Sequence, residues 1–209
     1  MRRSSSVLKL AAEVVSVVFA VLVALGIDQW WESRENADLA RVSLEAITRE
    51  IRENRNQLVD YGEMPPVDEM IAGLDSVIAD FSRGDDPRNA SVNYDLALLS
   101  SAAWETAQLN RATQYMTLDQ VVSLARLYEF QRYYERAQDE VFDAITGIRA
   151  SGDEAAGEMR ALRSKLATAV GFRETLAHTY ACNLVAIEGP DAPESEACPE
   201  SGSGSTPGG

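Results

Sequence analysis

The chain has 209 residues, of which 45% are hydrophobic, and its 33 acidic and 19 basic side chains give a net charge of −14. This length leaves room for one domain of moderate size beside an N-terminal anchor and a tail. Because nucleic acids and anionic lipid surfaces require clustered Lys and Arg, the negative charge argues against both as binding partners. Beyond the N-terminal segment, alternating runs of β-branched residues are nearly absent, which predicts an all-α fold.

The most apolar part of the chain lies near its N-terminus. Residues 14–27 carry no charge and are dominated by Val, Ala and Leu. Extended from Lys9 to Trp31, a helix is about 34 Å long, enough for the roughly 30 Å hydrocarbon core of a bilayer. We therefore predict a transmembrane helix over residues 7–31. Its predicted interface residues are Lys9 and Glu13, one turn apart at one end, and Trp30 and Trp31 at the other.

Basic residues around this segment predict its direction in the membrane. Three precede the apolar run and two follow shortly after it, which favours residues 1–6 in the cytoplasm and the remainder in the periplasm, with the span in a bacterial inner membrane. An alternative is a cleaved signal peptide ending at Ala24-Leu25-Gly26, although Glu13 is unusual in such a peptide. Under both interpretations the rest of the chain is predicted to be exported. The basic residues are Arg2, Arg3 and Lys9 before the run, and Arg34 and Arg41 after it.

An apolar stripe with alternating spacings of three and four residues continues the first helix to about Asp60. Asn54 lies within this stripe and allows two interpretations. In a dimeric stalk it sets the register between two copies, whereas in an intramolecular bundle the stripe is simply the inner face of the first helix. The small residues of the stripe near the membrane favour the intramolecular bundle.

Further helices complete a predicted antiparallel bundle of about four to five helices over residues 32–187. Proline and glycine turns separate several of them, and Thr117 with Gln120 forms a capping box at the start of the fourth. The last two helices are joined by a short turn, so we expect them to form a hairpin. The predicted helices after the first are Val67–Ser82, Tyr94–Gln108, residues 117–150 and the stretch from the turn at 151–154 to Ile187.

The middle of the 117–150 helix is more polar and aromatic than its ends. Such a centre is typical of a small-molecule pocket inside a bundle, but also of a partly exposed helix, and a nearby tryptophan fits a packed core. The candidate pocket residues are Trp104, Tyr128, Gln131 and Tyr134.

Two cysteines, Cys182 and Cys198, are predicted to form a disulfide, because an isolated pair in an exported domain is most simply bonded. In the loop-entropy model a bridge of this span stabilises the fold by about 3 kcal/mol. It folds the acidic tail, residues 188–209, back onto the last helix. The alternative is two free thiols in a cytoplasmic domain.

The last helix also carries Glu174, His178 and Cys182 on one face, a set of metal-ligand and nucleophile types. Successive side chains on one face are about 6 Å apart along the axis, so three of them rarely converge on one ion. A disulfide also removes Cys182 as a nucleophile. The sequence has no second His, no phosphate-binding glycine loop and no hydrolase elbow. We therefore expect no enzyme activity, no metal and no cofactor.

Two patches of the sequence resemble a known group of proteins. The first is Gly26-Ile27-Asp28-Gln29-Trp30, and the second is Ala103-Trp104-Glu105-Thr106, which precedes a tyrosine-containing helix. Both are similar to a large group of uncharacterised bacterial single-span membrane proteins, in which an apolar helix with such an ending leads into a helical domain. The resemblance implies membrane attachment and no assigned activity.

These features together predict a non-enzymatic, single-pass membrane protein whose helical domain is an interaction or scaffold module. Its expected partners are the lipid bilayer and either another membrane or periplasmic protein or a second copy of the chain. Nucleic acid is not an expected partner. The alternative is an extracytoplasmic bundle that senses a small ligand and signals through a membrane partner.

Overall fold

The computed structural model describes residues 4–60, 67–83, 96–148 and 153–198; the side chains of 4–15, 17, 67–68 and 153 are outside this description. Within these ranges the chain forms five α-helices and two 3₁₀ helices and no strand, which confirms the predicted all-α bundle. The elements are α1 (Ser4–Val59), α2 (Val67–Arg83), α3 (Ala102–Leu109), η1 (Ala112–Tyr115), α4 (Leu118–Gly147), α5 (Asp153–Glu188) and η2 (Ser195–Ala197).

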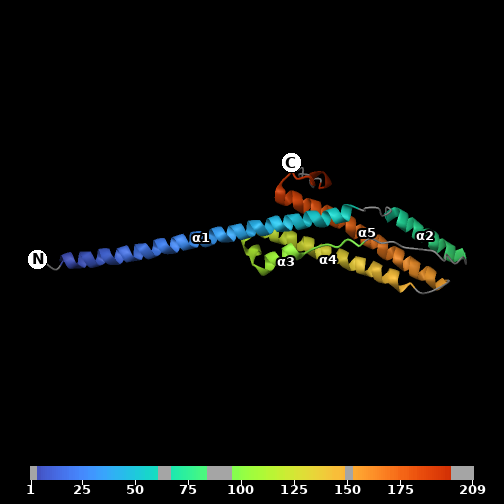
Figure 1. Cartoon of the computed structure of the whole chain (residues 1–209), viewed down its shortest axis with the longest axis horizontal. Coiled ribbons are helices and arrows are strands. Elements are labelled where there is room, and N and C mark those ends of the chain that lie inside the picture. Colours follow the sequence, from blue (N-terminus) through green and yellow to red (C-terminus); the bar gives the residue numbers. More distant parts are fainter. Residues whose placement is uncertain (1–3, 61–66, 84–95, 149–152, 199–209) are drawn as a thin grey trace, which may run out of the picture.

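The first helix, α1, has 56 residues and is therefore about 84 Å long. Its N-terminal half projects away from the bundle and its C-terminal half packs within it (Figure 1). Ala40 is the first buried side chain along its described part, and Ile47, Ile51 and Leu58 are fully buried. The predicted stripe is thus the inner face of an intramolecular bundle, and Asn54 is buried within the same chain.

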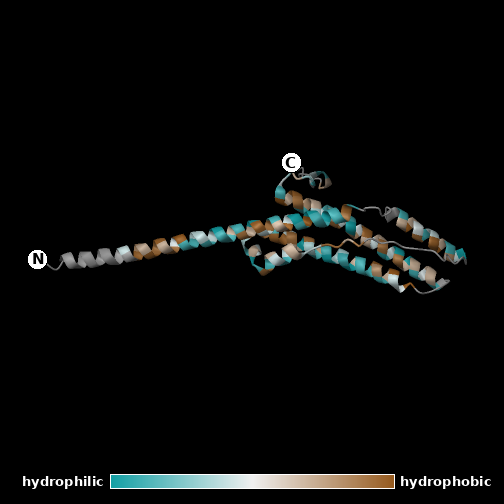
Figure 2. Ribbon diagram, viewed as in Figure 1, coloured by the Kyte–Doolittle hydropathy of each residue, from teal (hydrophilic) through white to brown (hydrophobic). Residues whose placement is uncertain are grey.

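Helices α4 and α5 form the predicted antiparallel hairpin, and α1 and α2 lie one after the other along α5 (Figure 1). One core cluster joins α1, α3, α4 and α5, and a second joins α2 to α4 and α5. In Figure 2 the apolar residues mark the inner faces of these helices and the projecting part of α1. The bundle therefore has a proximal half, next to the projecting helix, and a distal half that contains α2.

Two helix ends are closed by side chains. The predicted capping box of α4 is confirmed, since Thr117 Oγ1 accepts from the Gln120 backbone N–H at 3.2 Å and Gln120 Oε1 accepts from the Thr117 backbone N–H at 3.0 Å. At the C-terminus of α1, Arg173 of α5 donates to the carbonyl oxygens of Leu58 and Gln57 at 2.7 and 3.3 Å. These bonds satisfy backbone groups that have no partner inside their own helix.

The predicted helix Tyr94–Gln108 is wrong over its first part. The helix begins only at Ala102, and the described residues before it, 96–101, are not helical. Burial alternates there as in a strand: Ala97 is buried and Leu98 is 79% exposed. Side-chain amides from two other helices satisfy the backbone of this segment, so it gains nothing by forming its own helical bonds.

Among the residues that the structure describes, no helix has both the length and the apolar character that crossing a bilayer requires. The transmembrane helix over 7–31 therefore stays a prediction. The side chains of Lys9 and Glu13 lie outside the described residues.

Candidate functional site

A cluster of polar side chains lies buried in the proximal half of the bundle, where α1, α3, α4 and α5 meet. Burying so many polar atoms is costly unless each finds a hydrogen-bond partner. This makes the cluster the most unusual feature of the core and the first candidate for a functional site. We call it the central polar network; it consists of the buried residues Glu50, Asn54, Tyr128, Gln131 and Tyr180 and of the exposed Ser100, which bonds to several of them.

Glu50 of α1 is 7% exposed and joins three parts of the core. Its Oε1 accepts from the Tyr128 hydroxyl at 2.7 Å and the Trp104 backbone N–H at 3.4 Å. Its Oε2 accepts from the Ser100 hydroxyl at 2.7 Å and the Ala103 backbone N–H at 2.9 Å. The N-cap residue of α3 makes no side-chain cap. The Glu50 carboxylate therefore caps α3 from another helix, at the end where the helix dipole favours negative charge.

Two side-chain amides hold the extended segment 96–101. The Asn54 amide donates to the Ser100 carbonyl oxygen at 2.7 Å and accepts from the Ser100 N–H at 2.9 Å. The Gln138 amide does the same for Ala97, at 3.1 and 2.9 Å. Each amide offers one donor and one acceptor, as a neighbouring strand would. We call these two contacts the amide clamps.

Gln131 and Tyr180 complete the network. The Tyr180 hydroxyl donates to Gln131 Oε1 at 2.7 Å and accepts from the Asn54 amide at 3.4 Å. Gln131 Nε2 donates to Glu135 at 2.8 Å and to the Ser100 carbonyl oxygen at 3.3 Å. Both atoms of the Gln131 amide therefore bond protein atoms.

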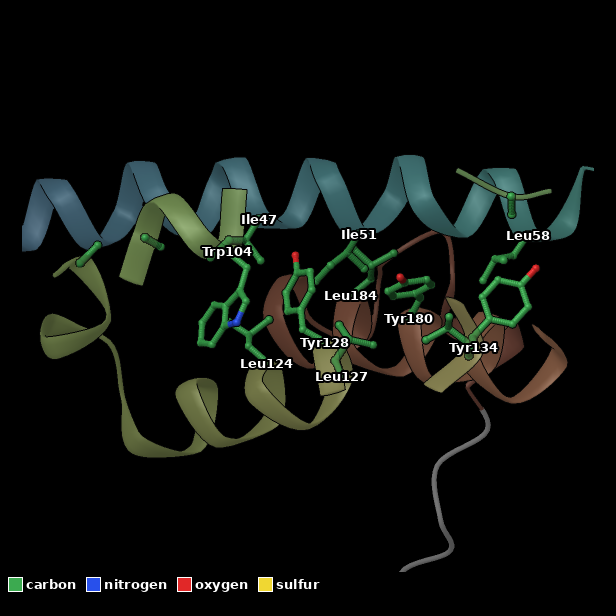
Figure 3. Close-up of a cluster of buried hydrophobic side chains, with 14 residues drawn as sticks. Ile47, Ile51, Leu58, Trp104, Leu124, Leu127, Tyr128, Tyr134, Tyr180 and Leu184 are labelled. Carbon is green, nitrogen blue, oxygen red and sulfur yellow. The ribbon is translucent and has the colours of Figure 1, made fainter. Parts of the chain in front are cut away.

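The four candidate pocket residues are all buried in this core. The Trp104 and Tyr128 rings stack 5.5 Å apart, and the Tyr134 hydroxyl donates to Gln138 at 3.1 Å. Figure 3 shows Trp104 beside Tyr128 and the Tyr128 hydroxyl directed toward α1. Three surface clefts in the described part of the chain are lined by other residues. The geometry is that of side chains packed against one another.

Burial acts on the two tyrosines of the network. It raises the pKa of Tyr128, and the adjacent Glu50 raises that pKa further. Burial likewise raises the pKa of Tyr180, against an opposing effect of its bond with Asn54. Both hydroxyls therefore stay protonated and act as hydrogen-bond donors within the network.

This leads to a prediction for alkaline pH. The pKa of both tyrosines is raised in the folded state, whereas in the unfolded chain it is about 10. Their contribution to stability is thus complete below about pH 10 and falls above it, by about 1.4 kcal/mol per pH unit and tyrosine. In a tyrosinate absorbance titration of the protein's seven tyrosines, at least two should ionise only when helical circular dichroism is lost.

Two variants control this titration. Tyr128→Phe and Tyr180→Phe should each remove one late-ionising group. Ionisation of all tyrosines near pH 10 with the helices intact would contradict the assignment.

The predicted disulfide between Cys182 and Cys198 is confirmed, with Cα atoms 5.0 Å apart. It holds η2 against α5, and His178 Nδ1 lies 2.8 Å from the Ala197 carbonyl oxygen. Since Cys182 is bonded, the face that it shares with His178 and Glu174 holds no free thiol. The closed loop, with a sequence separation of 16 residues, contributes about 3 kcal/mol in the loop-entropy model.

Arg52 of α1 forms ion pairs with the same C-terminal region. Its guanidinium donates to Glu188 at 2.6 Å and to the buried Glu194 at 3.3 Å. Together with the disulfide, these ion pairs fold the stretch after α5 back over the C-terminal half of α1. The sequence predicts the disulfide but not the pairing of these carboxylates with Arg52, because they belong to no motif.

Glu50 was also missed. A signal exists, because position 50 falls on the same helical face as Ile47, Ile51 and Asn54. A charged residue inside an otherwise apolar stripe indicates a buried polar contact. Its partners cannot be found this way, since they come from segments about 50 to 80 residues away.

The second candidate site is the projecting half of α1. Large apolar side chains there are 44–67% exposed. The predicted interface residues Trp30 and Trp31 pack edge to face, with ring centroids 5.7 Å apart, and the Arg34 guanidinium lies 5.0 Å from the Trp30 ring centre. The exposed apolar residues are Val18, Phe19, Val21, Leu22, Val23, Leu25, Ile27, Trp30 and Trp31.

A scan against protein-family models, a search of curated proteins and a search of solved structures each return no significant match. The resemblance to bacterial single-span membrane proteins therefore stays a prediction.

Proposed function

We propose that the protein is a single-pass membrane protein that anchors a non-enzymatic helical interaction or scaffold domain. The observation that supports it most is the exposed apolar surface of α1. The residues from Val18 to Ile27 are all exposed and all apolar except Gly26, and at about 100° per residue they cover all sides of the helix. A helix that pairs with a partner helix needs an apolar stripe on one side only, whereas a helix that is apolar all round suits a lipid environment.

The continuity of α1 also supports a retained anchor. The helix runs from Ser4 to Val59 through the possible cleavage site at 24–26 without interruption. From Ser4 to Trp31 its backbone covers about 41 Å, more than the hydrocarbon core requires. Trp30 and Trp31 follow the apolar residues, at the position where indole rings favour the interface. The proposed span over 7–31 begins among residues whose side chains lie outside the described part.

The disulfide supports export of the bundle, because such bonds persist in oxidising compartments. With the basic residues near the N-terminus, this favours an N-terminus in the cytoplasm and a periplasmic bundle. The non-enzymatic role is supported by the central polar network, whose carboxylate, amides and hydroxyls bond one another and the backbone. The proposed partner is another membrane or periplasmic protein, or a second copy of the chain.

Alkaline carbonate extraction of membranes tests the anchor. The full-length protein should remain in the membrane pellet, whereas a Val18→Arg/Val21→Arg variant should be released, since each arginine near the span's centre costs roughly 2.5–3.5 kcal/mol of insertion free energy. The matched control Val42→Arg/Val59→Arg places the same changes at exposed positions in the bundle half of α1, and should stay in the pellet. Release of the unaltered protein would refute the anchor.

Topology and partnership need separate measurements. A reporter that is active only in the cytoplasm, fused after Gly209, should be silent. Crosslinking in intact membranes followed by detergent extraction should yield complexes larger than the monomer. The scaffold proposal fails if the protein runs alone at every concentration.

A further inference from the structure

The connection between α3 and α4 lies at the end of the bundle from which α1 projects (Figure 1). We call residues 109–118 the proximal tip; they comprise η1 and the residues on either side of it. One surface cleft is lined by Tyr115 of the tip together with residues of α1 between Gln29 and Ala37. The tip therefore lies beside the turns of α1 that surround and follow Trp31.

The proximal tip contains both apolar side chains that pack against the core and apolar side chains that are exposed. Ala112 is buried and Met116 packs against the core cluster. In contrast, Leu109 at the end of α3 is 85% exposed and Leu118 at the start of α4 is 77% exposed. Tyr115, between them, is also exposed. Three large apolar or amphipathic side chains thus face outward from one short connection.

The tip also differs from the rest of the molecule in charge. Although the whole chain has a net charge of −14, residues 109–118 contain a single charged side chain, the basic Arg111. Arg111 is exposed and has a φ of 64°, in the left-handed region that non-glycine residues rarely adopt. The Asn110 side chain accepts the Ala112 backbone N–H at 3.0 Å, which stabilises this turn. Residues 109–118 therefore contribute no carboxylate that anionic lipid phosphates would repel; the nearest ones are Asp119, next to Leu118, and Glu32, in the cleft of Tyr115.

We infer that the proximal tip is a second membrane contact, at which Leu109, Tyr115 and Leu118 enter the interfacial layer of the bilayer that holds α1. This inference rests on the proposed anchor. With Trp31 at the edge of the hydrocarbon, Asn36 lies about 7.5 Å farther along the helix axis. The headgroup layer is roughly 5–8 Å thick on each side, and Asn36 and Tyr115 line the same cleft.

The interfacial layer suits these side chains, since tyrosine is amphipathic and exposed leucines lose contact with water there. A protein partner on this surface would have to share the space with the bilayer. The bilayer is the occupant we favour because the cleft that Tyr115 shares with Asn36 places the tip within about two turns of Trp31, where the proposed span ends. Two contacts, the anchor and the tip, would fix the tilt of the bundle relative to the membrane.

Spin-label accessibility in the full-length protein tests this inference. Single cysteines are introduced by Leu109→Cys and Leu118→Cys in the tip and by Leu22→Cys in the anchor. Leu98→Cys is a matched control, because Leu98 is also exposed, at 79%, but lies far from the tip. Its neighbour Ala97 is hydrogen-bonded to Gln138 of α4. Gln138 is 20 residues beyond Leu118 on this helix, which places it about 30 Å from the tip. The native cysteines are bonded to each other. The labelled proteins are reconstituted in phosphatidylcholine–phosphatidylglycerol vesicles.

The label at position 22 should be accessible to oxygen and shielded from a water-soluble nickel chelate. The accessibility of the labels at 109 and 118 to the chelate should be several-fold lower than that of the label at 98, while their accessibility to oxygen is kept. Equal chelate access at 98, 109 and 118, with position 22 in lipid, overturns the tip contact and leaves the anchor intact. If the labels at 109 and 118 were inaccessible to both reagents, the tip would contact protein, and this result would also overturn the proposed membrane contact. An aqueous position 22 refutes the proposed function itself.

Discussion

Glu50→Ala should destabilise the bundle by about 3 kcal/mol or more, because hydrogen bonds to a charged group contribute roughly 1.5–3 kcal/mol each and the Tyr128 hydroxyl stays buried without its acceptor. The substitution removes the acceptor of the Tyr128 hydroxyl and of the Ser100 hydroxyl. It also leaves the Ala103 N–H at the start of α3 without its cap. The measurement is urea denaturation of the full-length protein in detergent micelles, followed by circular dichroism and tryptophan fluorescence.

Glu50→Gln separates charge from shape. Glutamine has nearly the same size, but its NH₂ group replaces one acceptor with a donor and would face donors. We expect this variant to lose more than half as much stability as Glu50→Ala. The matched control is Glu45→Ala, on an exposed face of the same helix, where the side chain pairs only with Arg41 at 2.8 Å among the contacts described. Exposed ion pairs contribute about 0–1 kcal/mol to stability, so the control should change the urea midpoint of unfolding only slightly.

A Tyr128→Phe/Glu50→Ala double-mutant cycle tests whether the two residues act through their shared hydrogen bond. If they do, the double variant should lose less stability than the sum of the single variants. If Glu50→Ala and Glu45→Ala unfolded at the same urea midpoint, with the same slope of unfolding free energy against urea concentration, the role of the central polar network would be contradicted.

Most of the fold could be predicted because its signals are local. The predicted end of the first helix, near Asp60, agrees with the observed end at Val59, and the predicted end of the last helix, near Ile187, agrees with the observed end at Glu188. Apolar periodicity and the turn residues between helices determine these positions within a few residues of sequence. The disulfide was predictable because two cysteines allow only one intramolecular pairing.

The missed features depend on distant parts of the chain. Residues 96–101 have a composition compatible with a helix, but Asn54 and Gln138, each more than 40 residues away, supply the partners that keep them extended. The role of Glu50 depends in the same way on Tyr128, 78 residues away. A sequence pattern reports the face on which a residue lies; it does not report which segment will meet that face.

The amide clamps should control whether the extended segment stays attached. In an Asn54→Ala/Gln138→Ala variant, the backbone N–H and carbonyl groups of Ala97 and the N–H of Ser100 lose their partners, whereas the Ser100 carbonyl oxygen keeps its bond from Gln131. Leaving the groups of the buried Ala97 without partners costs about 1–3 kcal/mol each, so the segment should detach and bond water instead. Detachment limits the total loss of stability to about 2–4 kcal/mol, less than the sum of the single variants, because both clamps hold one segment.

Hydrogen exchange of individual amides measures this detachment. The Ala97 and Ser100 amides should be protected in the unaltered protein and exchange at least about 30-fold faster in the double variant, which corresponds to roughly 2 kcal/mol of local opening. The matched control is Asn56→Ala/Gln57→Ala, which makes the same side-chain changes at exposed positions of α1. Unchanged exchange of both amides in the clamp variant would show that packing of Ala97 and Leu99 holds the segment instead.

The pattern of exchange across the molecule is the decisive part of this experiment. The segment 96–101 leads directly into α3 and the proximal tip, whereas α2 packs against α5 in the separate distal cluster. Loss of the clamps should therefore accelerate exchange in α3 and η1 but leave the amides around Leu162 and Leu166 unchanged. If both halves opened together, the two core clusters would form one cooperative unit, and the clamps would stabilise the whole bundle rather than position its proximal half.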